Sequence, residues 1–362
     1  MAANQPRALT EKVSPGKTTR ISAAGMAVAI AAVILAVMAG LMLGPMSQET
    51  ATVDETTYLG GGYAYFQTGS AKMAEEQPLL LQMLLAAPML SMDVHISETA
   101  RALMEMRAFS PLAWTWNGGP ARPMLEVFPQ GVTWYHFGLP EAQYFGQILV
   151  YDQHNDAEKI MFRTRLVALA FTAATGAFLF FWARQLTGNA WAGVMAAALW
   201  AFNPIALAYG HLTITEPGIS LLFPVAVWWF TWTVQAPSLR NAFLLGAAMA
   251  VALELKIVAL LLWPLFVALL LIWQLRVRGT ADSPRLFSLP LKGFLQRFGF
   301  VLAGFWVAVL VIYFPHWSPP PSVEPQQARA LGVPDWFVAL RHVLIPGTFF
   351  KSVTLKTMHS QV

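Results

Sequence analysis

Acidic residues stand beside long apolar stretches at three places in the sequence. Asp54 and Glu55 follow the first stretch, Glu76 and Gln77 lead into a second, and Glu216 begins a third. A carboxylate at the boundary between apolar surface and water can have its pKa tuned to take a proton from a hydroxyl or an amine. The alternative is structural, because acids in the first turn of a helix face its positive end. Asp54 is therefore a candidate general base, whereas the acids before the second and third stretches are equally compatible with a structural role at a helix start.

Basic residues accompany the same stretches. Arg163 and Arg165 stand at the start of the apolar run 166–182, and Lys256 separates the runs 242–253 and 257–273. A phosphate group favours such partners, since arginine offers a bidentate fork and lysine a point charge. The alternative, which we favour for Arg163, is a side chain that reaches out to lipid headgroups. Acids and cations together indicate a site for a lipid phosphate.

A divalent metal ion is a further candidate ligand. His211 lies close to Glu216 in the sequence, and both residue types bind metals, although a histidine in a loop is more often only a polar surface residue. Asp54 and Glu216 would also suit metal binding or acid–base work if they met. The chain has no cysteine, which excludes a thiolate nucleophile and a zinc–thiolate site.

Membrane helices must position these residues. The 362-residue chain is 56% hydrophobic and only 12% charged, with a mean hydropathy of +0.52, which is untypical of a soluble domain. Roughly 20 apolar residues suffice to cross a bilayer. We therefore predict an all-α polytopic membrane protein with about seven transmembrane helices, at 23–43, 166–182, 191–209, 219–234, 242–253, 257–273 and 298–313.

Two of these predicted spans have an alternative interpretation. Glu254 and Lys256 interrupt the stretch 242–273, and a single helix of that length would overshoot the bilayer, so we predict two helices there. The first run, 23–43, is longer than the apolar part of a cleavable signal peptide, so we interpret it as an uncleaved anchor.

The distribution of charge predicts the topology. Basic residues gather in 274–297, which favours a cytoplasmic location for that stretch and for the N-terminal tail, 1–22. The acidic first loop, 44–159, then lies outside, with an interfacial helix at 79–90. We expect one transmembrane domain over 23–314, followed by an extracytoplasmic segment, 315–362, that looks truncated. A net charge of +4 without a concentrated basic face predicts no nucleic-acid partner.

The ordered motifs resemble the membrane glycosyltransferases of the GT-C fold, in the branch of protein O-mannosyltransferases, lipid A aminoarabinose transferases and bacterial Rgt-like enzymes. The resemblance covers most of 25–275. Its motifs are DETTY at 54–58, EQPLL at 76–80, the start of the second span at 155–166, TEP at 215–217 and, more weakly, Lys256 with the run that follows.

The resemblance implies a function. Such enzymes transfer a sugar from a polyprenyl-phosphate donor to a protein, lipid or glycan acceptor on the non-cytoplasmic face, here the periplasmic face of a bacterial inner membrane. Asp54 would be the general base and Glu216 the second acidic group, which orients the acceptor or a metal. The implied substrate-binding residues are Glu55, Glu76, Gln77, Arg165 and Lys256.

Several positions depart from the family pattern. Glu216 stands where aspartate is commoner, Gln77 where lysine or histidine is commoner, and Thr57 where the aminoarabinose branch has arginine. These motifs therefore do not identify the transferred sugar. Two other functions remain as alternatives, a transporter or flippase of lipid-linked sugars and an inactive, truncated homologue. A transporter would need ionisable groups at mid-membrane depth, whereas the acids here are expected at the outer mouth.

Overall fold

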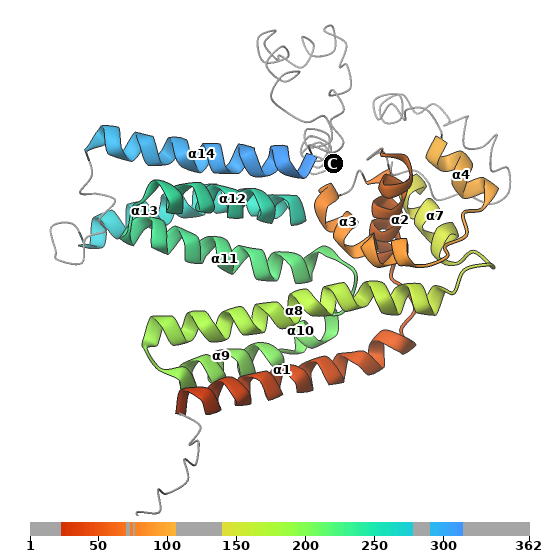
Figure 1. Cartoon of the computed structure of the whole chain (residues 1–362), viewed down its shortest axis with the longest axis horizontal. Coiled ribbons are helices and arrows are strands. Elements are labelled where there is room, and N and C mark those ends of the chain that lie inside the picture. The colour runs from red at the N-terminus through yellow and green to blue at the C-terminus, as the bar shows by residue number, and fades with distance from the viewer. Residues whose placement is uncertain (1–22, 70–72, 75–76, 106–139, 278–289, 314–362) are drawn as a thin grey trace, which may run out of the picture.

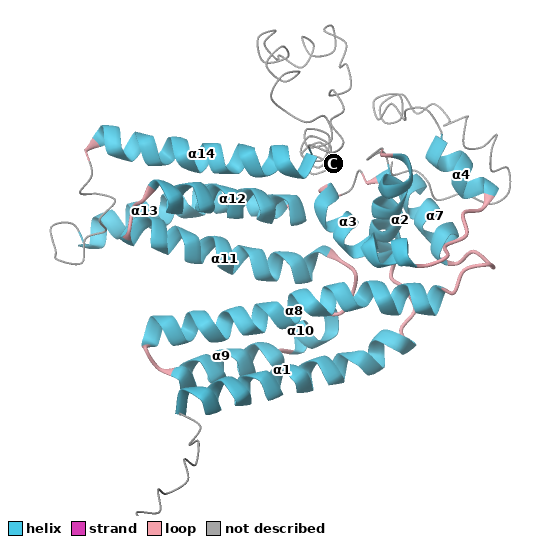
Figure 2. Cartoon of the chain, viewed as in Figure 1, coloured by secondary structure: helices cyan, strands magenta, loops and turns pink. Residues whose placement is uncertain are grey.

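The computed structural model describes residues 23–69, 73–74, 77–105, 140–277 and 290–313. Every regular element in these ranges is helical, which confirms the predicted all-α polytopic class (Figure 2). The N-terminal tail and the segment from 314 onwards lie outside the described residues. The elements are α1 (Ala23–Gln48), α2 (Val53–Thr68), α3 (Leu79–Ala86), η2 (Ala87–Ser91), α4 (Glu98–Glu105), α7 (Pro140–Val150), α8 (Ala157–Thr187), α9 (Ala190–Ala201), α10 (Pro204–Tyr209), α11 (Thr215–Gln235), α12 (Leu239–Leu255), η3 (Ile257–Leu261), α13 (Leu262–Val277) and α14 (Leu291–Tyr313).

Four described helices, α1, α8, α11 and α14, are long and apolar enough to cross a membrane. Each contains one of the predicted spans. The other three predicted spans, 191–209, 242–253 and 257–273, form shorter helices, so the expected seven full-length helices resolve into four long and several short ones. The interfacial segment 79–90 is helical as predicted, as α3 followed by η2.

A polar residue divides the predicted span 191–209. Asn203 caps α10, because its side-chain oxygen accepts hydrogen bonds from the backbone N–H groups of Ile205 and Ala206. Pro204 occupies the first turn of α10, where a missing N–H costs nothing. The span is therefore two helices, α9 and α10, rather than one.

The predicted break between the fifth and sixth runs is confirmed. Helix α12 ends at Leu255, and Lys256 has extended backbone angles (φ −156°, ψ 129°) before η3 begins at Ile257. An extended residue cannot continue the helical hydrogen-bond ladder. The chain thus turns at Lys256 instead of running on as one long helix.

The helices form two groups in Figure 1. The long helices α1, α8, α11, α12 and α14 lie side by side as a bundle, whereas α2, α3, α4 and α7 gather at one end of it. The end of α1, the start of α8, the start of α11 and the end of α12 all lie at that same end. The residues that the sequence singles out are therefore carried to one end of the molecule.

Helices α2 and α7 touch through their backbones. A Cβ atom on Gly60 would lie 2.7 Å from the Cα of Gly146, and one on Gly146 would overlap the carbonyl oxygen of Thr56. Fully buried apolar side chains, among them Leu59 and Phe145, surround this crossing. Close packing on all sides fixes the direction in which α2 presents its first turn.

Candidate functional site

The centre of the site is a buried ion pair between α2 and α8. The Nε of Arg165 donates to Oε1 of Glu55 at 2.9 Å, and its Nη2 donates to Oε2 at 2.8 Å. Both side chains are completely buried. The two residues are 110 positions apart in the sequence, so this bidentate pair joins the first loop to the second long helix.

Arg165 also caps the C-terminal end of α1. Its Nη1 donates to the carbonyl oxygens of Met46 and Glu49, and Nη2 donates to that of Thr50. A guanidinium group has five N–H donors, and with the two bonds to Glu55 every one of them is used. Positive charge at the C-terminal end of a helix is also favourable to the helix dipole.

The carboxylate of Glu55 accepts three further hydrogen bonds. Its Oε1 accepts from the backbone N–H and the hydroxyl of Thr213, and its Oε2 accepts from the backbone N–H of Thr52. Thr52 returns the bond by accepting from the N–H of Glu55, which forms a capping box at the start of α2. Burial alone would raise the pKa of Glu55, but the hydrogen bonds from Arg165, Thr52 and Thr213 hold that pKa below its ordinary value.

Asp54 behaves differently from its neighbour. It occupies the first turn of α2, its side chain is exposed, and it has no hydrogen bond or ion pair with the described residues. A hollow of about 340 Å³ lies beside this turn, lined by the start of α2 (Thr52, Val53 and Thr56) and the end of α7 (Gln147 and Ile148). Two adjacent acids therefore have opposite surroundings, one buried and paired and the other accessible.

Glu216 and Lys256 form the second pair of the site. The Nζ of Lys256 lies 2.5 Å from Oε1 of Glu216, and Oε2 of Glu216 accepts from the hydroxyl of Thr215. The lysine side chain is 24% exposed and the glutamate side chain 49% exposed. Unlike Arg165, this lysine remains accessible from solvent at the junction of α11 and α12.

His211 is bonded to an acid that sequence reasoning missed. Its Nε2 lies 2.9 Å from Oε2 of Glu49, while its Nδ1 is buried and has no partner in the described part of the chain. The structure gives His211 and Glu216 different partners instead of a shared position around one metal ion. A metal held by these two residues thus stays a prediction.

The proline-containing motif before α3 is only partly described. Glu76 lies outside the described residues, and Gln77 is buried, with an Oε1 atom that has no partner among them. The backbone carbonyl of Gln77 accepts a hydrogen bond from the side chain of Gln82. Gln77 therefore belongs to the packed connection in front of α3.

Of the predicted residues, the structure brings together Glu55 with Arg165 and Glu216 with Lys256. Within the described ranges, Asp54 forms no hydrogen bond or ion pair with Glu216 or Arg165. Sequence reasoning missed Glu254, whose Oε2 accepts a 2.6 Å hydrogen bond from Tyr313. The pattern Thr52-x-x-Glu55 is a capping-box signature that could have indicated the structural role of Glu55.

The fold and the site define a class, a polytopic helical membrane protein with paired ionisable groups at one end of its bundle. A family model described as dolichyl-phosphate-mannose-protein mannosyltransferase matches residues 157–289, from the start of α8 past the end of α13. This match confirms, for residues 157–289, the expected resemblance to mannosyltransferases of the GT-C type. Arg165, Glu216 and Lys256 fall inside the matched residues, whereas Asp54 precedes them. Searches of curated proteins and of solved structures gave no match.

Proposed function

We propose that this protein transfers a sugar from a polyprenyl-phosphate donor to a protein, lipid or glycan acceptor, with Asp54 as the general base. The family match supports glycosyltransferase activity in general. The observation that carries the proposal is the contrast between two adjacent acids at the start of α2: Glu55 is buried in an ion pair with Arg165, and Asp54 is exposed. A general base must be free to approach the proton that it removes.

The proposed reaction is a displacement at the anomeric carbon of the sugar. A hydroxyl or amine of the acceptor attacks that carbon and gives its proton to the carboxylate of Asp54. The bond between the anomeric carbon and the phosphate oxygen breaks, and its electron pair stays on the polyprenyl phosphate that leaves. A base at the nucleophile and a cation at the leaving phosphate each lower the barrier to this step.

Lys256 is the cation that we assign to the leaving phosphate. It is accessible, and its partner Glu216 is about half exposed, so a phosphate oxygen can take the place of the glutamate oxygen. Glu216, once released, would be free to contact the acceptor as the second acidic group. Lysine suits this exchange because its charge is compact and its stem is flexible.

Arg165 and Glu55 receive a different role from the substrate binding that the sequence led us to expect. All donors of Arg165 are engaged by protein atoms, so contact with a phosphate would require the loss of a buried ion pair. We assign both residues to positioning, since they hold the first turn of α2, and with it Asp54, against α8 and the end of α1. Gln77 and Glu76 keep their proposed place near the donor.

The proposed orientation puts the end of the bundle that carries Asp54 on the extracytoplasmic face, in a bacterial inner membrane. The basic stretch 274–297 then faces the cytoplasm, as the positive-inside rule requires. Accessibility of a cysteine introduced at Thr50 to a membrane-impermeant thiol reagent in intact cells tests this orientation. Labelling only after the cells are opened would overturn it.

Reconstitution tests the function itself. The full chain in liposomes is supplied with a panel of radiolabelled polyprenyl-phosphate hexoses and pentoses and with protein, lipid and glycan acceptors. We expect a glycosidic product and one polyprenyl phosphate released for each sugar transferred. Movement of the intact donor across the bilayer without any product would favour the transporter instead, and neither product nor movement with any donor would count against both.

A further inference from the structure

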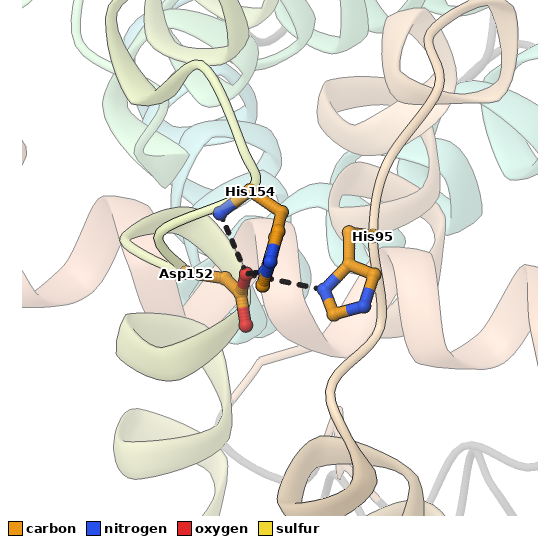
Figure 3. Close-up of side chains that lie close together, drawn as sticks. All are labelled: His95, Asp152 and His154. Carbon is orange, nitrogen blue, oxygen red and sulfur yellow. Dashed lines mark hydrogen bonds and ion pairs between the residues drawn. The ribbon is translucent and has the colours of Figure 1, made fainter.

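A second cluster of ionisable side chains lies away from the pairs described above. His95 belongs to the segment between η2 and α4, and Asp152 and His154 belong to the link between α7 and α8. In Figure 3 both imidazole rings point toward the carboxylate of Asp152. The Nδ1 atoms of His95 and His154 lie 3.1 Å and 3.0 Å from the same atom, Oδ1 of Asp152.

The backbone around the cluster is fixed by one asparagine. Oδ1 of Asn155 accepts from the N–H of His95 at 2.7 Å, and its Nδ2 donates to the carbonyl oxygens of His95 at 2.9 Å and of Leu149 at 2.7 Å. The N–H of His154 also donates to Asp152. These bonds hold two segments, 60 residues apart in the sequence, in one register before any ligand arrives.

The spacing of the ligand atoms suits a small metal ion. Zinc binds histidine nitrogen and carboxylate oxygen at roughly 2.0–2.2 Å in a tetrahedral arrangement, which puts neighbouring ligand atoms about 3.3 Å apart. The two nitrogen–oxygen separations here are close to that value, and one ligand atom from each residue lies within 4.8 Å of the others. A modest rotation of the two rings would bring the nitrogens together around one ion.

The surroundings favour exchange with solvent. The side chains of His95 and His154 are 47% and 57% exposed, while that of Asp152 is only 11% exposed. An ion can thus approach from the open side, where water would complete its coordination. Two imidazoles with one carboxylate select a transition metal such as zinc over calcium or magnesium, which prefer oxygen ligands.

We propose that His95, Asp152 and His154 bind one divalent transition metal ion, with zinc the best match, and that this ion ties the segment before α4 to the start of α8. The site does not depend on the proposed sugar transfer. The effect of the ion is structural. The ion would oppose separation of the first-loop helices from α8, the helix that carries Arg165. A ligand that binds only the folded state stabilises that state.

Metal titration of the purified full chain tests the site. The protein is prepared without a polyhistidine tag, stripped with a chelator and titrated with zinc in competition with a chromophoric chelator. We expect one zinc ion per chain, a raised melting temperature, and loss of affinity of at least about tenfold in H95A, D152N and H154A. E158Q is the matched control, because it neutralises an exposed acid near the cluster, in the first turn of α8, that is not one of the three ligands, and it should bind zinc like the wild type.

A second measurement keeps the proposal testable if these variants fold poorly. Cobalt bound to the wild-type chain should show the visible absorption of a low-coordinate site, and X-ray absorption of the zinc form should show nitrogen and oxygen ligands at about 2.0–2.2 Å. Absence of stoichiometric uptake by the wild type would overturn the proposal. Equal affinity in H95A, H154A and wild type, or an equal loss of affinity in E158Q, would overturn it as well.

Discussion

Removal of Arg165 should be among the most destabilising single changes at this end of the bundle. The variant R165M deletes five hydrogen bonds and leaves the carboxylate of Glu55 buried, with only Thr213 and Thr52 as donors. Loss of one partner of a buried ion pair costs about 3–5 kcal/mol, because the remaining charge is left without compensation. That is a large part of the roughly 5–15 kcal/mol by which a typical domain is stable.

A matched variant separates the pair from general effects of charge and length. R163M removes an arginine two positions away on α8 that is only partly buried and has no ion pair with the described residues. We expect it to cost less than about 1 kcal/mol. The double variant E55Q/R165M, which removes both charges, should be more stable than the two single losses predict, with a coupling energy of about 0.5–3 kcal/mol.

The assay is reversible unfolding in mixed micelles, with the mole fraction of a denaturing detergent as the variable and far-ultraviolet circular dichroism as the signal. The five proteins to compare are the wild type, R163M, E55Q, R165M and E55Q/R165M. If R165M unfolds at the same midpoint as R163M, the ion pair is not the structural anchor that we describe. Strict additivity in the double variant would contradict the coupling.

Three further predictions concern stability and transfer. G146A should destabilise by about 1–3 kcal/mol, because its Cβ would overlap the carbonyl of Thr56. G299A has open space on helix α14 and should cause no loss of stability in the same unfolding assay. The pKa of Glu55 is lowered in the folded protein, so the stability that ionised Glu55 contributes is complete above the unfolded pKa of about 4.5 and is lost as pH falls through the folded pKa. The melting temperature of E55Q should therefore depend less on pH at the acid end than that of the wild type. Identical profiles would contradict this. K256Q should lower kcat/KM for the donor about 10–100-fold, the equivalent of one charge-assisted hydrogen bond of about 1.5–3 kcal/mol, and an unchanged value would remove Lys256 from the proposal.

Local signals in the sequence were enough to predict the helical membrane class and the break near Lys256. Apolar length decides whether a segment prefers lipid, and a polar residue such as Lys256 amid apolar neighbours is costly unless the helix ends there. The division of 191–209 was also readable in principle, since Asn203-Pro204 is a helix-start signature within that run. Composition outweighed that signal in our prediction.

The pairing within the site could not be read in the same way. Glu55 and Arg165 are 110 residues apart, and no local pattern tells which acid meets which cation. Sequence reasoning grouped Arg165 with Lys256 as phosphate ligands, because both are basic and both lie beside apolar runs. Only burial separates them, since Arg165 is enclosed by protein carbonyls and Lys256 is open to solvent. Tertiary packing fixes that difference.

The most direct test of the central claim is the rate of sugar transfer by D54N. The matched control is E158Q, which neutralises another exposed acid, in the first turn of α8. Both variants are reconstituted in liposomes with the best donor and acceptor, and glycosidic product is measured under single-turnover conditions. Loss of a general base predicts a rate about 10²–10⁴-fold below wild type for D54N, with E158Q near wild type. Wild-type turnover by D54N, in protein that unfolds like the wild type, would contradict the assignment of Asp54 as the base.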